Sequence, residues 1–169
     1  MRDYGSLFLY HLREEALVLE GCREGIRRYK SILADIPPYG RSHESVVSFR
    51  TTLSDVASAI RFRDSTPEFE AAALAALIRH SAILGCYSIG ELDFGRYSSV
   101  ERFCDRQGLP GVYPEEYRLL YDFRLALSDG KVPPGGASYS RVKEWHTMAE
   151  VIVEEVTRVS TPEMSCSPR

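Results

Sequence analysis

Arg124 is the side chain in this sequence whose setting most suggests chemistry. It lies near the end of an apolar, tyrosine-bearing run, residues 120–130, which stops at Gly130. A guanidinium group can bind phosphate oxygens through two parallel hydrogen bonds. Cleaving RNA without a metal also needs a group that exchanges a proton near neutral pH, which Asp129 with an aspartate pKa of ~4 does poorly. We therefore expect Arg124 and Asp129 to form an ion pair or a helix-end contact rather than a catalytic pair.

His80 and His146 are the histidines that a divergent catalytic site around Arg124 would have to use. His80 follows Arg79 in the most apolar segment of the chain, where an unpaired charge is costly. Arg79 and His80 can form a buried polar network that fixes the packing, or they can face a ligand or partner. The sequence leaves both interpretations open. His11, near the N-terminus, is interpreted as a surface or hydrogen-bonded histidine.

His146 also stands five residues after Arg141, which raises the question of whether the two side chains could act together. Both residues fall within one predicted helix. Five residues turn a helix by ~500°, which leaves the two side chains ~140° apart. We interpret this spacing as a coincidence.

Composition sets limits on the class of protein. The chain has 169 residues, 44% of them hydrophobic, which suits one compact domain with a sizeable core. Its net charge of −3 does not favour nucleic-acid binding, which normally leaves a basic footprint. The four cysteines lie far apart and without a CxxC pair, so we expect reduced thiols in a cytoplasmic protein; they are Cys22, Cys86, Cys104 and Cys166.

No metal or cofactor site is expected from the spacing of the acidic residues. Asp93, Asp122 and Asp129 do not form a metal-binding pattern, and the Gly-Ser and Asp-x-Asp motifs that nucleotidyl transfer needs for Mg²⁺ are missing. No apolar run reaches the ~18 residues of a membrane span, and the N-terminus carries charges instead of a signal sequence. We expect a soluble protein without a membrane partner.

The N-terminal 41 residues are expected to form a docking arm. Apolar residues spaced by three and four predict one long amphipathic helix through residue 34, although residues 7–10 could instead be a short strand. The dipeptide Pro37-Pro38 then predicts a turn.

Residues 42–159 are expected to form an all-α, up-and-down bundle. Apolar stripes and capping residues predict five helices, of which the second has so little polar surface that it should be the central one. The stripe of the last helix, which contains Trp145, suits a seam in the bundle or a contact between two chains. Residues 160–169 are expected to be a disordered tail. The predicted helices cover residues 42–63, 67–88, 98–107, 115–128 and 140–159.

The run around Arg124 resembles the signature of HEPN domains, helical domains found beside nucleotidyltransferases and in prokaryotic RNases. That signature reads roughly Leu-Tyr-x-x-Arg-Asn, a few residues, then His-Gly. Arg124 and Gly130 match its arginine and glycine, whereas Leu125 and Asp129 replace its polar residue and its histidine. Two further segments are similar to the nucleotidyltransferase-linked members. One is the run Leu-Phe-Leu-Tyr-His-Leu at residues 7–12, and the other is residues 86–100, which contain Tyr-Ser-Ile-Gly and, at residues 94–96, Phe-Gly-Arg.

The resemblance implies an HEPN-like bundle of about five or six helices that self-associates. It also implies a non-catalytic binding or assembly module for a nucleotidyltransferase, in a toxin–antitoxin or defence pair, with RNA or a nucleotide as a further ligand. The residues expected to face the ligand or partner are Arg79, His80, Arg96 and Arg124. Two alternatives stay open. One is a divergent metal-independent ribonuclease that uses Arg124, Asp129 and His80 or His146; the other is a purely structural helical subunit.

Overall fold

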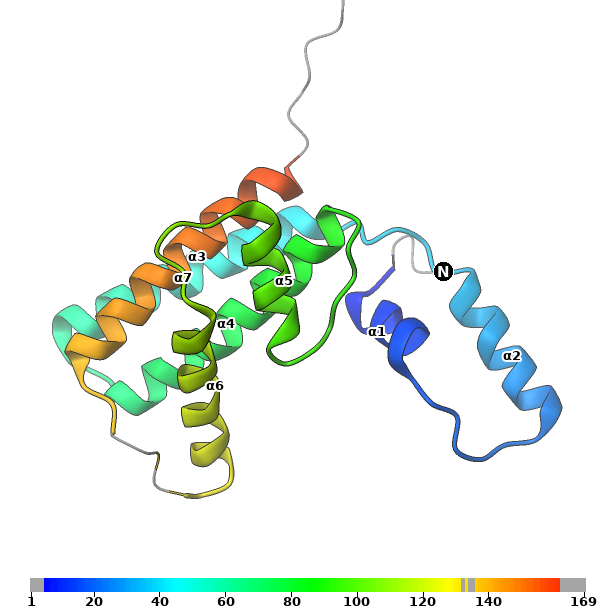
Figure 1. Cartoon of the computed structure of the whole chain (residues 1–169), viewed down its shortest axis with the longest axis horizontal. Coiled ribbons are helices and arrows are strands. Elements are labelled where there is room, and N and C mark those ends of the chain that lie inside the picture. The colour runs from blue at the N-terminus through cyan, green and yellow to red at the C-terminus, as the bar shows by residue number, and fades with distance from the viewer. Residues whose placement is uncertain (1–4, 132, 134–135, 162–169) are drawn as a thin grey trace, which may run out of the picture. The chain divides into compact units, whose positions relative to one another are not determined.

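The computed structural model describes residues 5–131, 133 and 136–161, and within these ranges every regular element is an α-helix. The chain divides into two units, Met1–Ser42 and His43–Arg169. Figure 1 shows the helices in chain order, and the prediction of an all-α protein is confirmed. The described helices are α1 (Leu7–Glu15), α2 (Arg23–Ala34), α3 (Ser42–Phe62), α4 (Pro67–Ser88), α5 (Ser98–Gln107), α6 (Pro114–Ser128) and α7 (Tyr139–Ser160).

The prediction of one long helix through residue 34 is wrong, because the helix is interrupted after Glu15. Ala16 has an extended backbone, and α2 begins anew after Cys22, whose Sγ accepts a hydrogen bond from Gly25 N at 3.4 Å. The intervening residues include a glycine and a β-branched valine, both poorer helix formers than alanine. The alternative of a strand over residues 7–10 is also wrong, since these residues belong to α1.

α4 is the central helix of the second unit, as its composition predicts. Twelve of its residues are buried, and it packs against α5, α6 and α7. Gly85 allows α5 to approach α4 closely, because a Cβ atom there would lie only 2.5 Å from Phe103 Cε2. The helix starts with Thr66, whose side chain accepts a hydrogen bond from Phe69 N, followed by Pro67 in the first turn.

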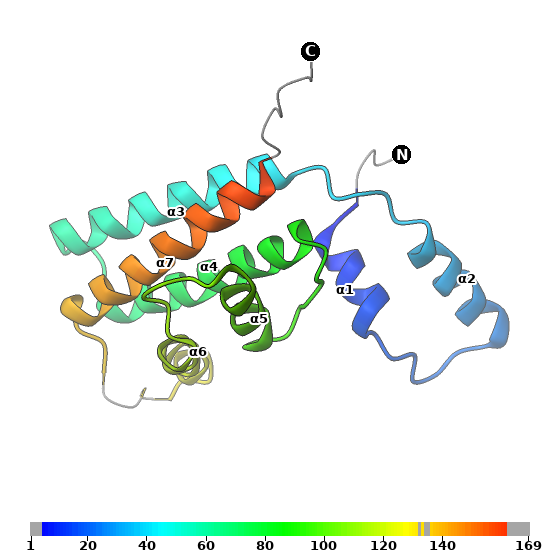
Figure 2. The same ribbon diagram turned by 45° about the horizontal axis from the view of Figure 1, so that its top comes forward.

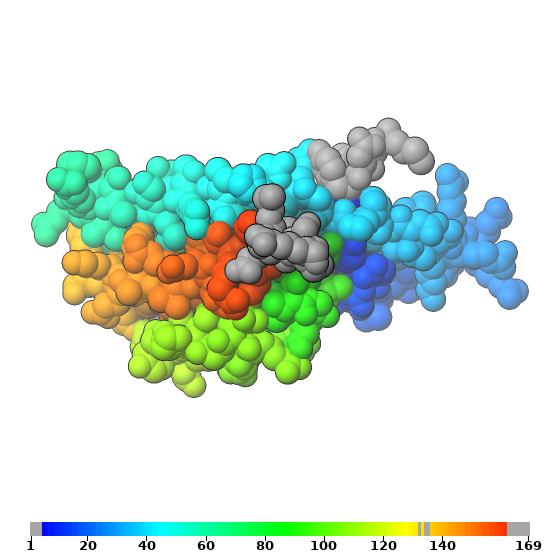
Figure 3. All heavy atoms as spheres, turned by 90° about the horizontal axis from the view of Figure 1, so that it is seen from above, coloured from blue at the N-terminus to red at the C-terminus, as the bar shows by residue number. Residues whose placement is uncertain are grey.

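α7 and α3 lie along one another in the same unit, as Figures 2 and 3 show. The α7 stripe is buried inside the bundle, with Trp145 only 3% exposed. The stripe of α3 is covered less completely: Val46 and Val56 are buried, whereas Phe49 and Leu53 are half-buried. All five predicted helices of this unit are confirmed to within one residue at each end. The predicted tail lies almost entirely outside the described residues.

α4 is also the one described helix that is long and apolar enough to cross a membrane by length and composition. It passes this test although Arg79 and His80 interrupt its apolar run. Of its most apolar window, 67% is buried within the structure, and buried core helices of soluble proteins pass the same test. The finding is weak support for a membrane span.

Candidate anion-binding site

Arg79 is held on α4 by the loop that connects α4 to α5. Its Nη2 donates a hydrogen bond to the backbone oxygen of Phe94 at 2.8 Å. The Nε atom of the same guanidinium is buried and has no hydrogen-bond partner among the described residues. The Nη2 atom of Arg79 therefore holds the loop, while its Nε–H remains an unsatisfied hydrogen-bond donor.

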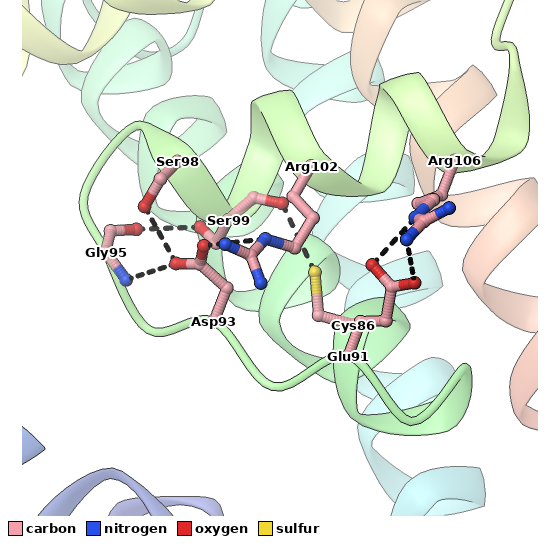
Figure 4. A network of polar contacts seen from close by, with 8 residues as sticks. All are labelled: Cys86, Glu91, Asp93, Gly95, Ser98, Ser99, Arg102 and Arg106. Atoms are coloured by element: carbon pink, nitrogen blue, oxygen red, sulfur yellow. Dashed lines mark hydrogen bonds and ion pairs between the residues drawn. The ribbon is translucent and has the colours of Figure 1, made fainter. Parts of the chain in front are cut away.

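The connecting loop, residues 89–97, is fixed by a buried carboxylate. Asp93 Oδ1 accepts hydrogen bonds from Gly95 N and from Ser98 Oγ, each at 2.8 Å. Its Oδ2 lies 3.1 Å from Arg102 Nε, and Figure 4 shows these contacts together. The loop is therefore held at Asp93 and Gly95, on both sides of residue 94. The backbone of Arg96 follows directly after this fixed segment.

Two buried cysteines, Cys86 and Cys104, have raised thiol pKa values. Cys86 Sγ donates a hydrogen bond to Ser99 O at 3.4 Å. Burial, followed by the negative charge of Asp93, raises the pKa of the Cys86 thiol to about 12. Burial likewise raises the pKa of Cys104 to about 12. Both thiols are thus neutral at physiological pH, whereas nucleophilic attack and metal binding need the thiolate.

Tyr121 on α6 is flanked by two arginines from different parts of the chain. The guanidinium carbons of Arg96 and Arg124 lie 5.7 and 5.8 Å from the centre of its ring. Such distances allow cation–π attraction, which offsets part of the repulsion between the two cations. Tyr117, one turn earlier, donates a hydrogen bond from its hydroxyl to Arg96 O at 3.0 Å. α6 therefore holds Arg96 in place and carries Arg124 itself.

His80 completes this group of basic side chains. Partial burial lowers the pKa of its imidazole, and the positive charges of Arg79 and Arg124 lower it further, although one edge of the residue is exposed. The same two arginines act on the buried hydroxyl of Tyr117. We call these residues the basic cluster: Arg79, His80, Arg96 and Arg124. The four residues expected to face a ligand or partner thus come together in the structure, and their binding role stays a prediction.

The other sequence candidates lie outside the basic cluster. Asp129 caps the end of α6 and pairs with Lys131 at 2.9 Å. No ion pair joins Asp129 to Arg124 among the described residues, because five helical residues turn the two side chains ~140° apart. The expected ion pair is therefore wrong, whereas Asp129 does lie at the helix end.

His146 is buried between α7 and α3. Its Nε2 lies 2.9 Å from Leu53 O, and its Nδ1 lies 3.6 Å from Glu150. Arg141 instead lies over the ring of Trp145 and 3.8 Å from Glu116 on α6. The two side chains diverge, as the helical rotation predicts. His11 lies on α1 and pairs with Glu15 at 3.1 Å.

No group of three or more metal-binding side chains occurs in the part of the chain that the structure describes. Each aspartate considered from the sequence has another partner: Asp93 pairs with Arg102, Asp129 with Lys131, and Asp122 accepts a hydrogen bond from the Tyr97 hydroxyl. What the sequence analysis missed is this aromatic support, in which Tyr97, Tyr117 and Tyr121 contact one another. The four-residue spacing of Tyr117 and Tyr121 was the available signal.

Comparison with known proteins adds no relative, since no family model, curated protein or solved structure matches this chain. The chemistry of the site therefore has to be argued from its own residues.

Proposed function

We propose that this protein is a non-catalytic binding and assembly module that works with a nucleotidyltransferase in a toxin–antitoxin or defence pair. In this proposal α3 to α7 form a five-helix, HEPN-like bundle. The basic cluster is the surface that binds an anionic group, either a phosphate or a carboxylate of the partner. The link to a nucleotidyltransferase comes from the resemblance of residues 7–12, 94–96 and 120–130.

The observation that carries the proposal is the convergence of three arginines that form no ion pair, although the Asp122 carboxylate lies close to Arg96 through their shared contact with the Tyr97 hydroxyl. Arg79, Arg96 and Arg124 form no ion pair with any described carboxylate, whereas Arg102, Arg106, Arg118 and Arg158 each do. Arg96 is exposed and Arg124 is half-buried, so both remain accessible to a ligand. Partly desolvated guanidinium groups bind phosphate or carboxylate strongly. Binding alone does not accelerate a reaction when the ground state is held as tightly as the transition state.

The proposal is tested by isolating the protein from its own cells and measuring the complexes by native mass spectrometry. We expect a complex with a nucleotidyltransferase that is weakened in an Arg96→Ala/Arg124→Ala variant. Arg106→Ala is the matched control, because Arg106 is an exposed arginine that already pairs with Glu91 at 2.6 Å. A complex that survives the double change would contradict the role of the basic cluster. Isolation of the protein alone would favour a purely structural subunit.

Self-association is part of the proposal and rests on the resemblance. The α7 stripe no longer supports it, because that stripe is buried inside the bundle. Exposed apolar side chains remain on α3, where Val47 is 50% and Phe62 is 67% exposed. Light scattering at ~100 μM, well above a micromolar Kd, should show a species twice the monomer mass of 19.1 kDa. A monomer at that concentration would remove this part of the proposal.

The alternative of a metal-independent ribonuclease is favoured by one observation, the position of His80. Its lowered pKa keeps the imidazole neutral and able to accept a proton, and Arg124 lies close enough to act on it electrostatically. Asp129 and His146, the other residues considered for this role, lie elsewhere. Incubation with a mixed RNA pool in EDTA decides between the two functions. We expect no cleavage that depends on Arg124; cleavage lost in both His80→Ala and Arg124→Ala would establish the nuclease.

A further inference from the structure

The N-terminal unit exposes apolar side chains that its own two helices do not cover. Among its described residues only Gly5, Tyr10 and Leu33 are buried. Leu17 is 85% exposed and Leu19 is 94% exposed in the segment between α1 and α2. Chains below about 40 residues rarely bury enough surface to be stable without further support. A unit of this size with so small a core is expected to need an additional apolar surface.

A groove of about 520 Å³ between α1 and α2 is where such a surface can bind. This volume lies in the usual range for binding sites, about 300–1,000 Å³. The charged side chains that line the groove are both basic: Arg13, which pairs with Glu14 at 2.7 Å, and Lys30, which forms no ion pair among the described residues. The apolar residues that line it include Leu12, Leu17, Val18, Ile26, Tyr29 and Leu33.

The α2 side of the groove has a basic edge, formed by Arg23, Arg27 and Lys30. Their spacing of four and three residues places them on one stripe of α2. At 100° per residue this stripe lies about 90° around the helix from the groove-lining apolar residues. All three side chains are exposed, and none forms an ion pair with a carboxylate in the described part of the chain. The edge therefore has unneutralised positive charge directly beside an apolar groove.

The shape of the groove favours a helix as its occupant. The described residues of this unit contain no strand, so an incoming strand would find no sheet edge to extend. The backbone groups of α1 and α2 are largely satisfied within the helices, which leaves side-chain contacts as the means of binding. A helix in a groove binds in this way, through apolar residues spaced by three and four.

Charge disfavours two other occupants. A second copy bound through the same surface would bring two basic edges together, which is unfavourable. An anionic lipid surface would face Glu15 and Glu20, which flank the exposed segment around Leu17 and Leu19. We infer that the groove between α1 and α2 binds an amphipathic helix of a partner protein, with a row of acidic residues beside its apolar face. This site is separate from the basic cluster, and the inference does not depend on the proposed function.

Two synthetic peptides test the inference with the full-length protein. Both carry the same leucine face over about 15 residues, the length at which isolated helices begin to form. One has glutamates along the edge of that face and the other has lysines. Fluorescence anisotropy of labelled peptide should show about tenfold tighter binding of the glutamate peptide, the effect expected from three exposed ion pairs.

Variants of the exposed residues link the binding to this groove. The charge reversal Arg23→Glu/Arg27→Glu/Lys30→Glu should reverse the preference, so that the lysine peptide binds more tightly. Leu17→Asn should weaken the binding of both peptides at least tenfold. Leu119→Asn is the matched control, because Leu119 is a half-exposed leucine on α6, at 51% exposure. Far-UV circular dichroism verifies that each variant keeps its helix content.

Three outcomes overturn the inference. The first is that neither peptide binds. The second is that both bind equally and the charge reversal has no effect, which would mean nonspecific apolar adsorption. The third is that Leu17→Asn abolishes self-association or binding to anionic vesicles while leaving peptide binding unchanged, which would assign the surface to a second copy or to a membrane.

Discussion

The two units of this protein use apolar side chains in opposite ways. In the second unit, helix α4 buries twelve of its residues, and Trp145 on α7 lies against Phe123 with ring centres 6.2 Å apart. In the first unit, the largest apolar residues between α1 and α2 are exposed. The same residue types therefore form the core of the second unit and remain exposed in the first.

The arginines also fall into two groups, those with a carboxylate partner and those without one. Around the loop between α4 and α5, Arg102 and Arg106 are neutralised by Asp93 and Glu91, so they hold the fold together. The basic cluster and the α2 edge contain arginines without such pairs. The paired arginines contribute to the fold through their carboxylates, whereas the unpaired ones keep positive charge that we propose is used to bind an acidic ligand.

The largest effect is expected from Trp145→Ala in the second unit. Trp145 is 3% exposed, and its indole Nε1 lies 3.4 Å from Glu116 Oε2. Removing it should lower the free energy of unfolding by ~3–5 kcal/mol through lost burial and a residual cavity. Urea unfolding followed by far-UV circular dichroism measures this without relying on tryptophan fluorescence. A loss below ~1 kcal/mol would show that α7 does not belong to the core.

A smaller effect is expected from Asp93→Ala. This change removes the acceptor for Gly95 N and Ser98 Oγ and leaves Arg102 without its carboxylate. The free energy of unfolding should fall by about 2 kcal/mol, because buried donors lose their partner. Glu91→Ala breaks an exposed pair with Arg106 and should cost less than about 1 kcal/mol. Equal costs for the two changes would mean that the loop is not fixed by Asp93.

The next prediction concerns how the stability of the protein depends on pH through His80. The pKa of His80 is lowered in the folded protein from its ordinary value of 6.5, so the unfolded chain binds more protons at mildly acidic pH. Stability should therefore fall as the pH drops through 6.5 towards the folded-state pKa, and it is unaffected by this group well above 6.5.

His80→Gln should reduce that slope when urea unfolding is compared at about pH 7.5 and about pH 5.5. Arg124→Gln should raise the pKa of His80, because it removes one of the positive charges that lower it. NMR titration of the imidazole measures the pKa directly. A value above 6.5 would show that His80 does not lie beside the arginines in solution.

The smallest effect is expected from Leu19→Ser in the first unit. Leu19 is 94% exposed, so the free energy of unfolding should change by less than about 0.5 kcal/mol. Thermal or urea unfolding of the isolated protein measures it. A loss above about 2 kcal/mol would mean that this segment is already covered in the free protein, and the contrast between the two units would not hold.

The sequence by itself determined the all-α class and the helices of the second unit. Those helices have apolar periodicity together with local start signals, such as Thr66 before α4 and Pro67 in its first turn. Both signals act within a few residues, so they can be found without knowing the fold. The interruption after Glu15 was missed because the apolar spacing continues across it, while the break depends on local backbone conformation.

Only the tertiary structure decided which charged side chains meet. Arg96 and Arg124 are 28 residues apart in the chain and share the ring of Tyr121 because α5 and α6 pack beside α4. His146 faces Leu53 across the contact between α7 and α3, which excludes it from the basic cluster. Such contacts between side chains depend on how the helices pack. The periodicity of the sequence specifies which face of a helix is apolar, but not which helix will cover it.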